Sequence, residues 1–368
     1  MSWKSIICRA ESLLGGRCPA VDLSLLGKSE STLLIERVRS LASMSDHKIV
    51  PVICTELENN PNNNFLKFRN WTNMFSTKKA IPRFPSSMVI PLIGQCVSID
   101  DPHSLQLHRK MGEIFALINL AIALHRTVVD LSDPLFQQQR DDLAWVKNME
   151  LGNKLAVLAG DILLAKASVE LASFRIPKIV EIISGAIVEA VCAEFTDLAT
   201  GSTHSLTHPS TNWLEHVKLR HGALLGECCA AASLLSSPSA KSVEELLKGV
   251  REFGVNWASL SRLLSELDFV KELRIDNSEP PKTLTSLGFT ESGLPEPTLA
   301  DTLLRASEST PSTIYDQYKS IASTLARQLG DSFGRLLEQS SADSDVHSLA
   351  KESVDLLVKE ADLCTDFS

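Results

Sequence analysis

The hydrophobic and polar positions of this chain repeat with the period of a helix. Short apolar stretches cover 31–45 and 86–99, and Pro177 marks a further helix start because proline suits the first helical turn. No segment alternates cleanly between apolar and polar residues, as a half-buried strand would. The pattern therefore predicts an all-α protein. Apolar residues recur about every 3.6 positions over 103–131, 142–172, 213–235, 242–270, 311–341 and 345–361.

Two segments interrupt this helical pattern. Residues 57–74 contain an Asn-rich insert, which predicts a surface loop of unknown role. Residues 276–298 contain four prolines and predict a long loop that sets off C-terminal helices in 299–368. Because no repeat of fixed period occurs, we expect residues 1–368 to form a single all-α domain.

The charge of the chain excludes some classes of partner. Its 36 Lys and Arg residues against 45 Asp and Glu residues give a net charge of −9. A nucleic-acid partner is not expected, because phosphate binding needs clustered positive charge. The longest uncharged apolar run lies between Glu113 and Arg126, well short of the ~20 residues that a membrane-spanning helix needs. No transmembrane segment is therefore predicted.

The cysteines and the N-terminus bear on the cellular compartment. The eight cysteines are scattered without a C-x-x-C pair, which argues against a disulfide framework or zinc ribbon and favours a reducing compartment. Cys228 and Cys229 lie in an apolar run and are expected to pack rather than react. The start, MSWKSIICRAESLLGGRC, is slightly basic and amphipathic. It is either an ordinary first helix, which we favour, or a short organelle presequence.

Three stretches carry the most specific signal in the chain. They are LGNKLAVLAGDILLAKA (151–167), INLAIALHRTVVDLSD (118–133) and FGVNWASLSRLLSEL (253–267). In order and spacing they resemble the trans-polyprenyl diphosphate synthase family. The first is similar to the G-N-x-x-A-V-L-x-G-D stretch of that family, and the others to the helices that carry its two aspartate-rich motifs. The resemblance covers roughly 86–275 and implies the isoprenoid synthase fold, a bundle of long helices around a central cavity.

Under this resemblance, the positions of the first stretch that match the family signature are expected to have a structural role. We expect Asp161 to be buried in its apolar helix and therefore to need hydrogen-bond partners. His125 and His221 are expected at the core or at the edge of the cavity. The positions that carry the family signature are Gly152, Asn153, Lys154, Gly160 and Asp161.

Both aspartate-rich motifs are degenerate in this chain. The family uses their carboxylates to bind the magnesium ions that hold the diphosphate leaving group, because Mg²⁺ prefers hard oxygen ligands. Asp130 alone keeps its carboxylate, and Arg126 and Arg262 would repel a cation. The resemblance implies a chain with no catalytic residue and no bound metal, beside a partner that binds Mg²⁺. The motif positions are Arg126, Thr127 and Asp130 in the first motif and Ser261, Arg262 and Ser265 in the second.

The basic residues near these motifs leave two interpretations open. In the first, Arg126, Arg220 and Arg262 face one cavity and form a metal-free anion pocket for a diphosphate. In the second, each arginine pairs with a helix carboxylate. The sequence supports both interpretations, because charge alone does not show which groups face one another.

This pattern of loss resembles one branch of the family, the second subunit of heteromeric all-trans decaprenyl (or solanesyl) diphosphate synthases. That branch keeps an R-H-G-A-L-L stretch, which spans 220–225 here, and lacks the aspartates. The resemblance implies a non-catalytic but required subunit in the mitochondrial matrix, with an absent or short presequence. An aspartate-complete partner, in a heterotetramer, would condense isopentenyl diphosphate onto an allylic diphosphate to make the ubiquinone side chain.

Two further functions stay open at this point. The chain could act as a regulatory or lipid-binding helical protein that has no synthase partner. It could also be an enzyme with altered chemistry. For a synthase partner, the expected contacts are the alanine-rich residues 230–235 and the apolar residues 111–124, because obligate interfaces are large and apolar.

Overall fold

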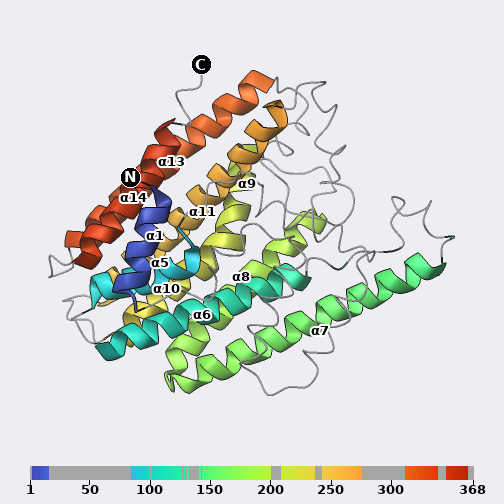
Figure 1. The fold of residues 1–368 in the computed structure, drawn as a ribbon, viewed down its shortest axis with the longest axis horizontal. Helices are drawn as coiled ribbons and strands as arrows, with labels where there is room; N and C mark the ends of the chain where they lie inside the picture. Colours follow the sequence, from blue (N-terminus) through green and yellow to red (C-terminus); the bar gives the residue numbers. More distant parts are fainter. Residues whose placement is uncertain are drawn as a thin grey trace.

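The described part of the chain is a bundle of helices in a computed structural model (Figure 1). No strand occurs in the described ranges, which confirms the all-α prediction. The short apolar stretch 31–45, the Asn-rich insert 57–74 and the predicted loop 276–298 lie outside the described residues. The structure describes residues 2–15, 84–98, 102–125, 143–199, 209–236, 243–275, 311–338 and 345–363, with the single positions 128, 131 and 141.

The helices begin and end close to the predicted positions. Several begin at a proline, whose missing N–H falls where a helix has no acceptor for it. Acidic residues occupy the first turn of α11 and of α14, where they stabilise the helix dipole. The order is α1 (Trp3–Leu13), α5 (Ser86–Val97), α6 (Pro102–His125), α7 (Leu143–Ser173), α8 (Pro177–Ala199), α9 (Pro209–Val217), η3 (Lys218–Gly222), α10 (Ala223–Leu235), α11 (Val243–Ile275), α13 (Pro311–Glu338) and α14 (Asp345–Leu363).

Helix α10 lies inside the bundle and packs against α5, α6, α8 and α11. Ala230, Ala231 and Ala232 of α10 have no exposed surface. Their small side chains let the four neighbouring helices approach α10 closely. The prediction that 230–235 contacts a partner is therefore wrong for these alanines. It is also wrong for most of 111–124, whose large apolar side chains are buried within the same core.

The crossing of α10 and α11 is especially close because glycines meet there. A Cβ at Gly254 would lie 2.7 Å from the Gly226 Cα, and a Cβ at Gly226 would lie 2.7 Å from the Arg251 carbonyl oxygen. The predicted helix over 213–235 is divided just before this crossing by a π-helical segment, Lys218–Gly222. A π segment adds a residue to a turn, so it changes which side chains face α11.

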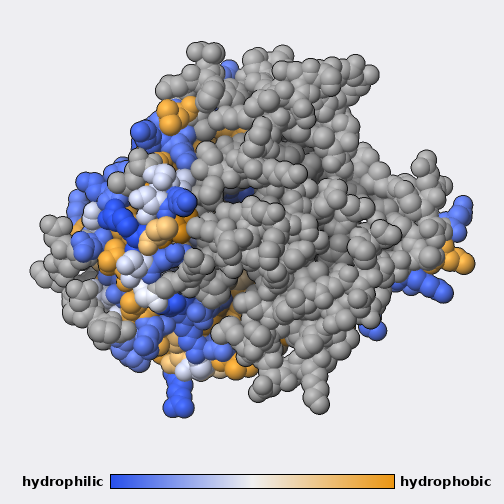
Figure 2. Space-filling model, viewed as in Figure 1, coloured by the Kyte–Doolittle hydropathy of each residue, from blue (hydrophilic) through white to orange (hydrophobic). Residues whose placement is uncertain are grey.

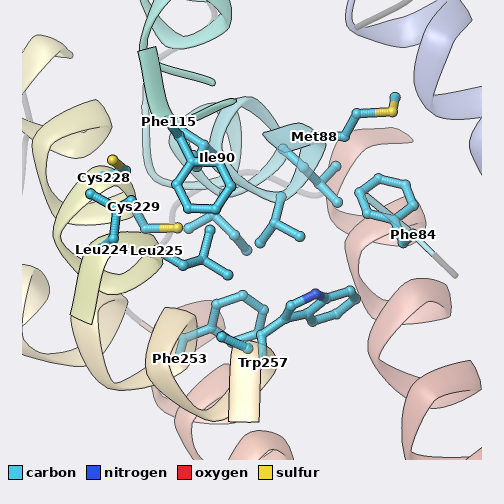
Figure 3. Close-up of a cluster of buried hydrophobic side chains, with 14 of the residues drawn as sticks. Phe84, Met88, Ile90, Phe115, Leu224, Leu225, Cys228, Cys229, Phe253 and Trp257 are labelled. Atoms are coloured by element: carbon cyan, nitrogen blue, oxygen red, sulfur yellow. The ribbon is translucent and has the colours of Figure 1, made fainter. Parts of the chain in front are cut away.

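Aromatic rings form a continuous row through the core. Ring centroids are 6.5 Å apart for Trp3 and Phe84, 6.1 Å for Phe84 and Trp257, 5.9 Å for Trp257 and Phe253, and 5.7 Å for Phe253 and Phe333. Side chains from α5, α6, α10 and α11 fill the space between these helices (Figure 3), so the predicted cavity does not lie at this junction. Cys228 and Cys229 are fully buried, as expected for packing residues, and burial raises the pKa of both thiols.

The first helix belongs to the same bundle. Trp3, Ile6, Ile7 and Ala10 of α1 are buried, and α1 packs against α14. The Trp3 indole N–H donates to Glu360 at 2.6 Å, which ties the two ends of the described chain together. Trp3–Leu13 is thus a helix packed in the bundle, as the first of the two interpretations expects.

A buried polar network joins α5, α6 and α10. The Gln95 amide donates to His108 Nδ1 at 3.0 Å and to Ser104 Oγ at 3.1 Å, and His108 Nε2 lies 2.7 Å from Ser236 Oγ. The Ser236 hydroxyl donates to the Ala232 carbonyl, so His108 Nε2 must carry the proton and Nδ1 must accept. Burial lowers the pKa of His108 to about 4, because the charged ring would lose its contact with water. The hydrogen-bond network fits the neutral ring.

Acid is expected to destabilise the fold through His108. An unfolded histidine titrates near pH 6.5, so the stabilising effect is complete above that pH and is lost as the pH falls toward 4. The expected loss by pH 4 is about 3 kcal/mol. Urea unfolding at several pH values, compared with His108→Gln, measures it. An equally steep loss of stability in the variant over this range would show that other groups cause it.

Candidate functional site

The second degenerate motif lies on α11 and faces the interior only in part. Arg262 is buried, Ser261 is half-buried and Ser265 is exposed. The Ser265 hydroxyl donates to the backbone carbonyl of Ser261 at 2.8 Å, which satisfies it within its own helix. The three positions therefore present one guanidinium and two small hydroxyl groups.

Arg262 is held in a buried ion pair. Its Nη2 atom lies 2.9 Å from Glu266 Oε1, one turn further along α11. The two side chains are only 6% and 3% exposed. The Tyr318 hydroxyl on α13 donates to the second Glu266 oxygen at 3.2 Å. For Arg262, the structure thus bears out the interpretation that the arginine pairs with a helix carboxylate.

The donor groups on this part of α11 do not fit a magnesium ion. Magnesium needs several carboxylate or carbonyl oxygens at one place, and Ser261 and Ser265 supply none of the missing carboxylates. Glu266 is the carboxylate on this face, and a guanidinium already neutralises it. Within the described ranges, no group of three or more histidine, cysteine, aspartate or glutamate residues could hold a metal ion.

Two positions of the family signature on α7, Gly160 and Asp161, lie against His125. A Cβ at Gly160 would overlap the imidazole ring of His125, so this position must be glycine for the end of α6 to pack against α7. His125 Nε2 lies 3.2 Å from the Val157 carbonyl oxygen and 3.3 Å from Asp161 Oδ1. Because the carbonyl can only accept, Nε2 carries the proton.

The prediction that Asp161 is buried is wrong. Its side chain is 60% exposed, and it pairs with His125 from the surface of α7. The 3.6-residue pattern did not reveal this, because α7 carries apolar residues on most of its circumference. Lys154 is exposed and Asn153 is half-buried, while the side-chain surroundings of Gly152 lie outside what the structure describes.

The first degenerate motif falls almost wholly outside the described residues. This applies to Arg126, Thr127 and Asp130. Arg220 is described: it is 6% exposed and lies in the π segment that packs against α11. His221 beside it is half-buried, as expected for the edge of the core. The anion pocket of Arg126, Arg220 and Arg262 stays a prediction, with Arg262 already paired to a carboxylate.

The profile of the polyprenyl synthetase family matches residues 86–257, which run from α5 to Trp257 on α11. Residues 86–257 thus form a polyprenyl synthetase domain. The matched residues include the signature on α7, the π segment and most of the α10–α11 crossing. The degenerate positions after Trp257 follow directly, on the same helix.

Curated relatives extend this match beyond the family profile. The human protein "All trans-polyprenyl-diphosphate synthase PDSS2" is 27% identical over 75% of this chain and 65% of its own length. The chain thus spans less than two thirds of this relative. The "Decaprenyl-diphosphate synthase" of Dictyostelium discoideum is 30% identical over 49% of the chain and 36% of its own length. The "Probable hexaprenyl pyrophosphate synthase, mitochondrial" of Neurospora crassa is 32% identical over 47% of the chain and 38% of its own length.

Solved structures of this family share the arrangement of helices. A decaprenyl diphosphate synthase from Rhodobacter capsulatus superposes with a TM-score of 0.58 and 14% identity, over 96% of this chain and 99% of that one. A geranyltranstransferase from Methanosarcina mazei gives a TM-score of 0.54 and 10% identity, over 91% and 99%. The chain therefore has the isoprenoid synthase fold. Within the described ranges, no helix has the length and apolar character needed to cross a membrane.

Proposed function

We propose that this chain is a non-catalytic, required subunit of a heteromeric all-trans polyprenyl diphosphate synthase. One observation carries the proposal. At the second aspartate-rich motif, the side chain that replaces a carboxylate is a guanidinium, buried in an ion pair with Glu266, which also accepts a hydrogen bond from the Tyr318 hydroxyl. The family fold is thus combined with a second motif that lacks the carboxylates with which the family binds its cation.

The proposal assigns the chemistry to the partner. An aspartate-complete chain would bind Mg²⁺ and condense isopentenyl diphosphate onto an allylic diphosphate, making the ubiquinone side chain. This chain would supply contacts that the active subunit needs in order to work. The names of the relatives, which include mitochondrial hexaprenyl synthases, support a mitochondrial location. The proposal places the chain on the matrix side.

The test is a synthase assay on three samples. They are this chain alone, its aspartate-complete partner alone, and the two purified after co-expression. Each receives an allylic diphosphate, labelled isopentenyl diphosphate and Mg²⁺. We expect long-chain product from the co-expressed pair only. A pair whose partner has its motif aspartates replaced by alanine is expected to be inactive, which would assign catalysis to the partner.

Two outcomes would contradict the proposal. Product from this chain alone would show that it has a catalytic metal site elsewhere. Equal product from the partner with and without this chain would show that it is not a required subunit. If no synthase chain co-purifies with it, the regulatory or lipid-binding function becomes the better explanation of the fold.

A further inference from the structure

A cleft opens between the first half of α11 and the last turns of α13. Its volume is about 280 Å³, and its floor is formed by Leu246 and Leu336, which are 2% and 1% exposed. None of the lining residues belongs to either degenerate motif, so the candidate site described above does not account for this cleft. The other lining residues are Glu245, Lys248, Gly249, Glu252 and Arg335.

Gly249 leaves room above the α11 backbone. A Cβ at this position would meet no atom of the described residues within 4 Å. Glycine inside a helix is less stable than alanine, and the packing of the described helices does not require glycine here. A glycine at such a place allows a side chain of another molecule to approach the helix backbone closely.

The charges beside the cleft follow the spacing of a helical face. Glu245, Lys248 and Glu252 lie three and four positions apart, so they project from one side of α11. Arg335 on α13 pairs with Glu252 at 2.8 Å, which holds the last of these carboxylates beside the cleft. Along α11 the charges are therefore negative, positive and negative. A second helix laid along α11 would match them with charges of the opposite order.

A membrane or a small molecule fits this cleft less well. Over α1, α13 and α14 the surface is mostly hydrophilic, and apolar residues occur only in small groups (Figure 2). A peripheral membrane contact needs a broad apolar face. The cleft volume of about 280 Å³ is also below the ~300–1,000 Å³ that is usual for ligand pockets. Its size and its apolar floor suit one large aliphatic side chain of a partner helix.

We propose that this cleft is the docking site for an amphipathic helix of a partner protein. The helix would place a leucine-sized side chain above Gly249. It would present a basic, an acidic and a basic residue on successive turns to Glu245, Lys248 and Glu252. A helix with the reverse order of charges would bring like charges together and is disfavoured. The inference goes beyond the proposed function and does not depend on it, because no motif residue takes part.

The test measures the affinity of the purified chain for two alanine-rich helical peptides of about 20 residues. Both peptides carry one central leucine. The first has Lys, Glu and Lys on successive turns beside it, and the second has Glu, Lys and Glu. We expect the first peptide to bind at least about tenfold more tightly. Exchanging two exposed charges, as Glu245→Lys with Lys248→Glu, keeps the net charge and is expected to reverse this preference.

Filling the cleft gives an independent readout. Gly249→Leu is expected to weaken binding of the first peptide at least about tenfold, because the new side chain would occupy the space of the peptide leucine. The variant should fold, since the position is open and leucine favours a helix. Gly330→Leu is the matched control. It changes an open glycine of α13 outside the cleft and is expected to bind like the unchanged chain.

Several results would overturn the inference. No binding of the first peptide at millimolar concentration, or equal binding of both peptides, would show that these charges do not select a helix. Equal binding by the Gly249→Leu variant and the unchanged chain would place the contact outside the cleft. Binding to vesicles of phosphatidylcholine and cardiolipin that is lost in Gly249→Leu, without peptide binding, would assign the cleft to a lipid instead.

Discussion

Replacing Glu266 with glutamine is expected to lower the free energy of unfolding by about 3–5 kcal/mol. The change removes the negative charge but keeps the shape of the side chain. Arg262 stays charged at every working pH, and it is 6% exposed, so its buried charge would lose the carboxylate with which it pairs. Urea unfolding of the purified chain, followed by far-UV circular dichroism, measures the loss.

Two further variants show that burial is the cause. Glu252→Gln breaks the pair with Arg335, which joins α11 to α13 at 2.8 Å but is 58% and 42% exposed. Its expected cost is below about 1 kcal/mol, because water screens an exposed pair. Replacing both buried partners, as Arg262→Met with Glu266→Leu, is expected to recover most of the stability. Equal losses for E266Q and E252Q would contradict this account of the site.

Replacing Gly254 with alanine is expected to cost about 3 kcal/mol. The new Cβ would lie 2.7 Å from the Gly226 Cα and 2.9 Å from the Gly226 backbone nitrogen. Backbone atoms cannot turn away as a side chain can, so α11 would have to move from α10. The same movement would displace Trp257 and the row of aromatic rings. Thermal and urea unfolding measure the change in stability.

Gly330→Ala is the matched control for this prediction. Gly330 lies exposed inside α13, and a Cβ there would meet no atom within 4 Å. Alanine favours a helix over glycine, so this variant is expected to gain up to about 1 kcal/mol. Replacing glycine with alanine is thus expected to lower the stability at Gly254 and to raise it at Gly330. A loss of stability at both would point to a general effect of glycine replacement rather than to the helix crossing.

The order and type of the helices follow from local chemistry. Proline at the first turn and a 3.6-residue apolar repeat act within one helix, so α6, α8, α11 and α13 could be predicted with small errors at their ends. The loss of the aspartates is likewise a property of residue types, since no packing can turn Ser261 or Ser265 into a magnesium-binding carboxylate. The degenerate residues of the second motif were therefore visible in the sequence.

What each side chain meets was decided by the assembled bundle. The alanines of 230–235 have the pattern of a contact surface, but four helices of this chain already cover them. Asp161 lies in an apolar stretch, yet it faces outward to His125. Glu266 pairs with Arg262 on its own helix and accepts a hydrogen bond from Tyr318 on another, 52 residues away in the chain. A sequence records how apolar each position is, whereas burial and pairing depend on which distant helix packs beside it.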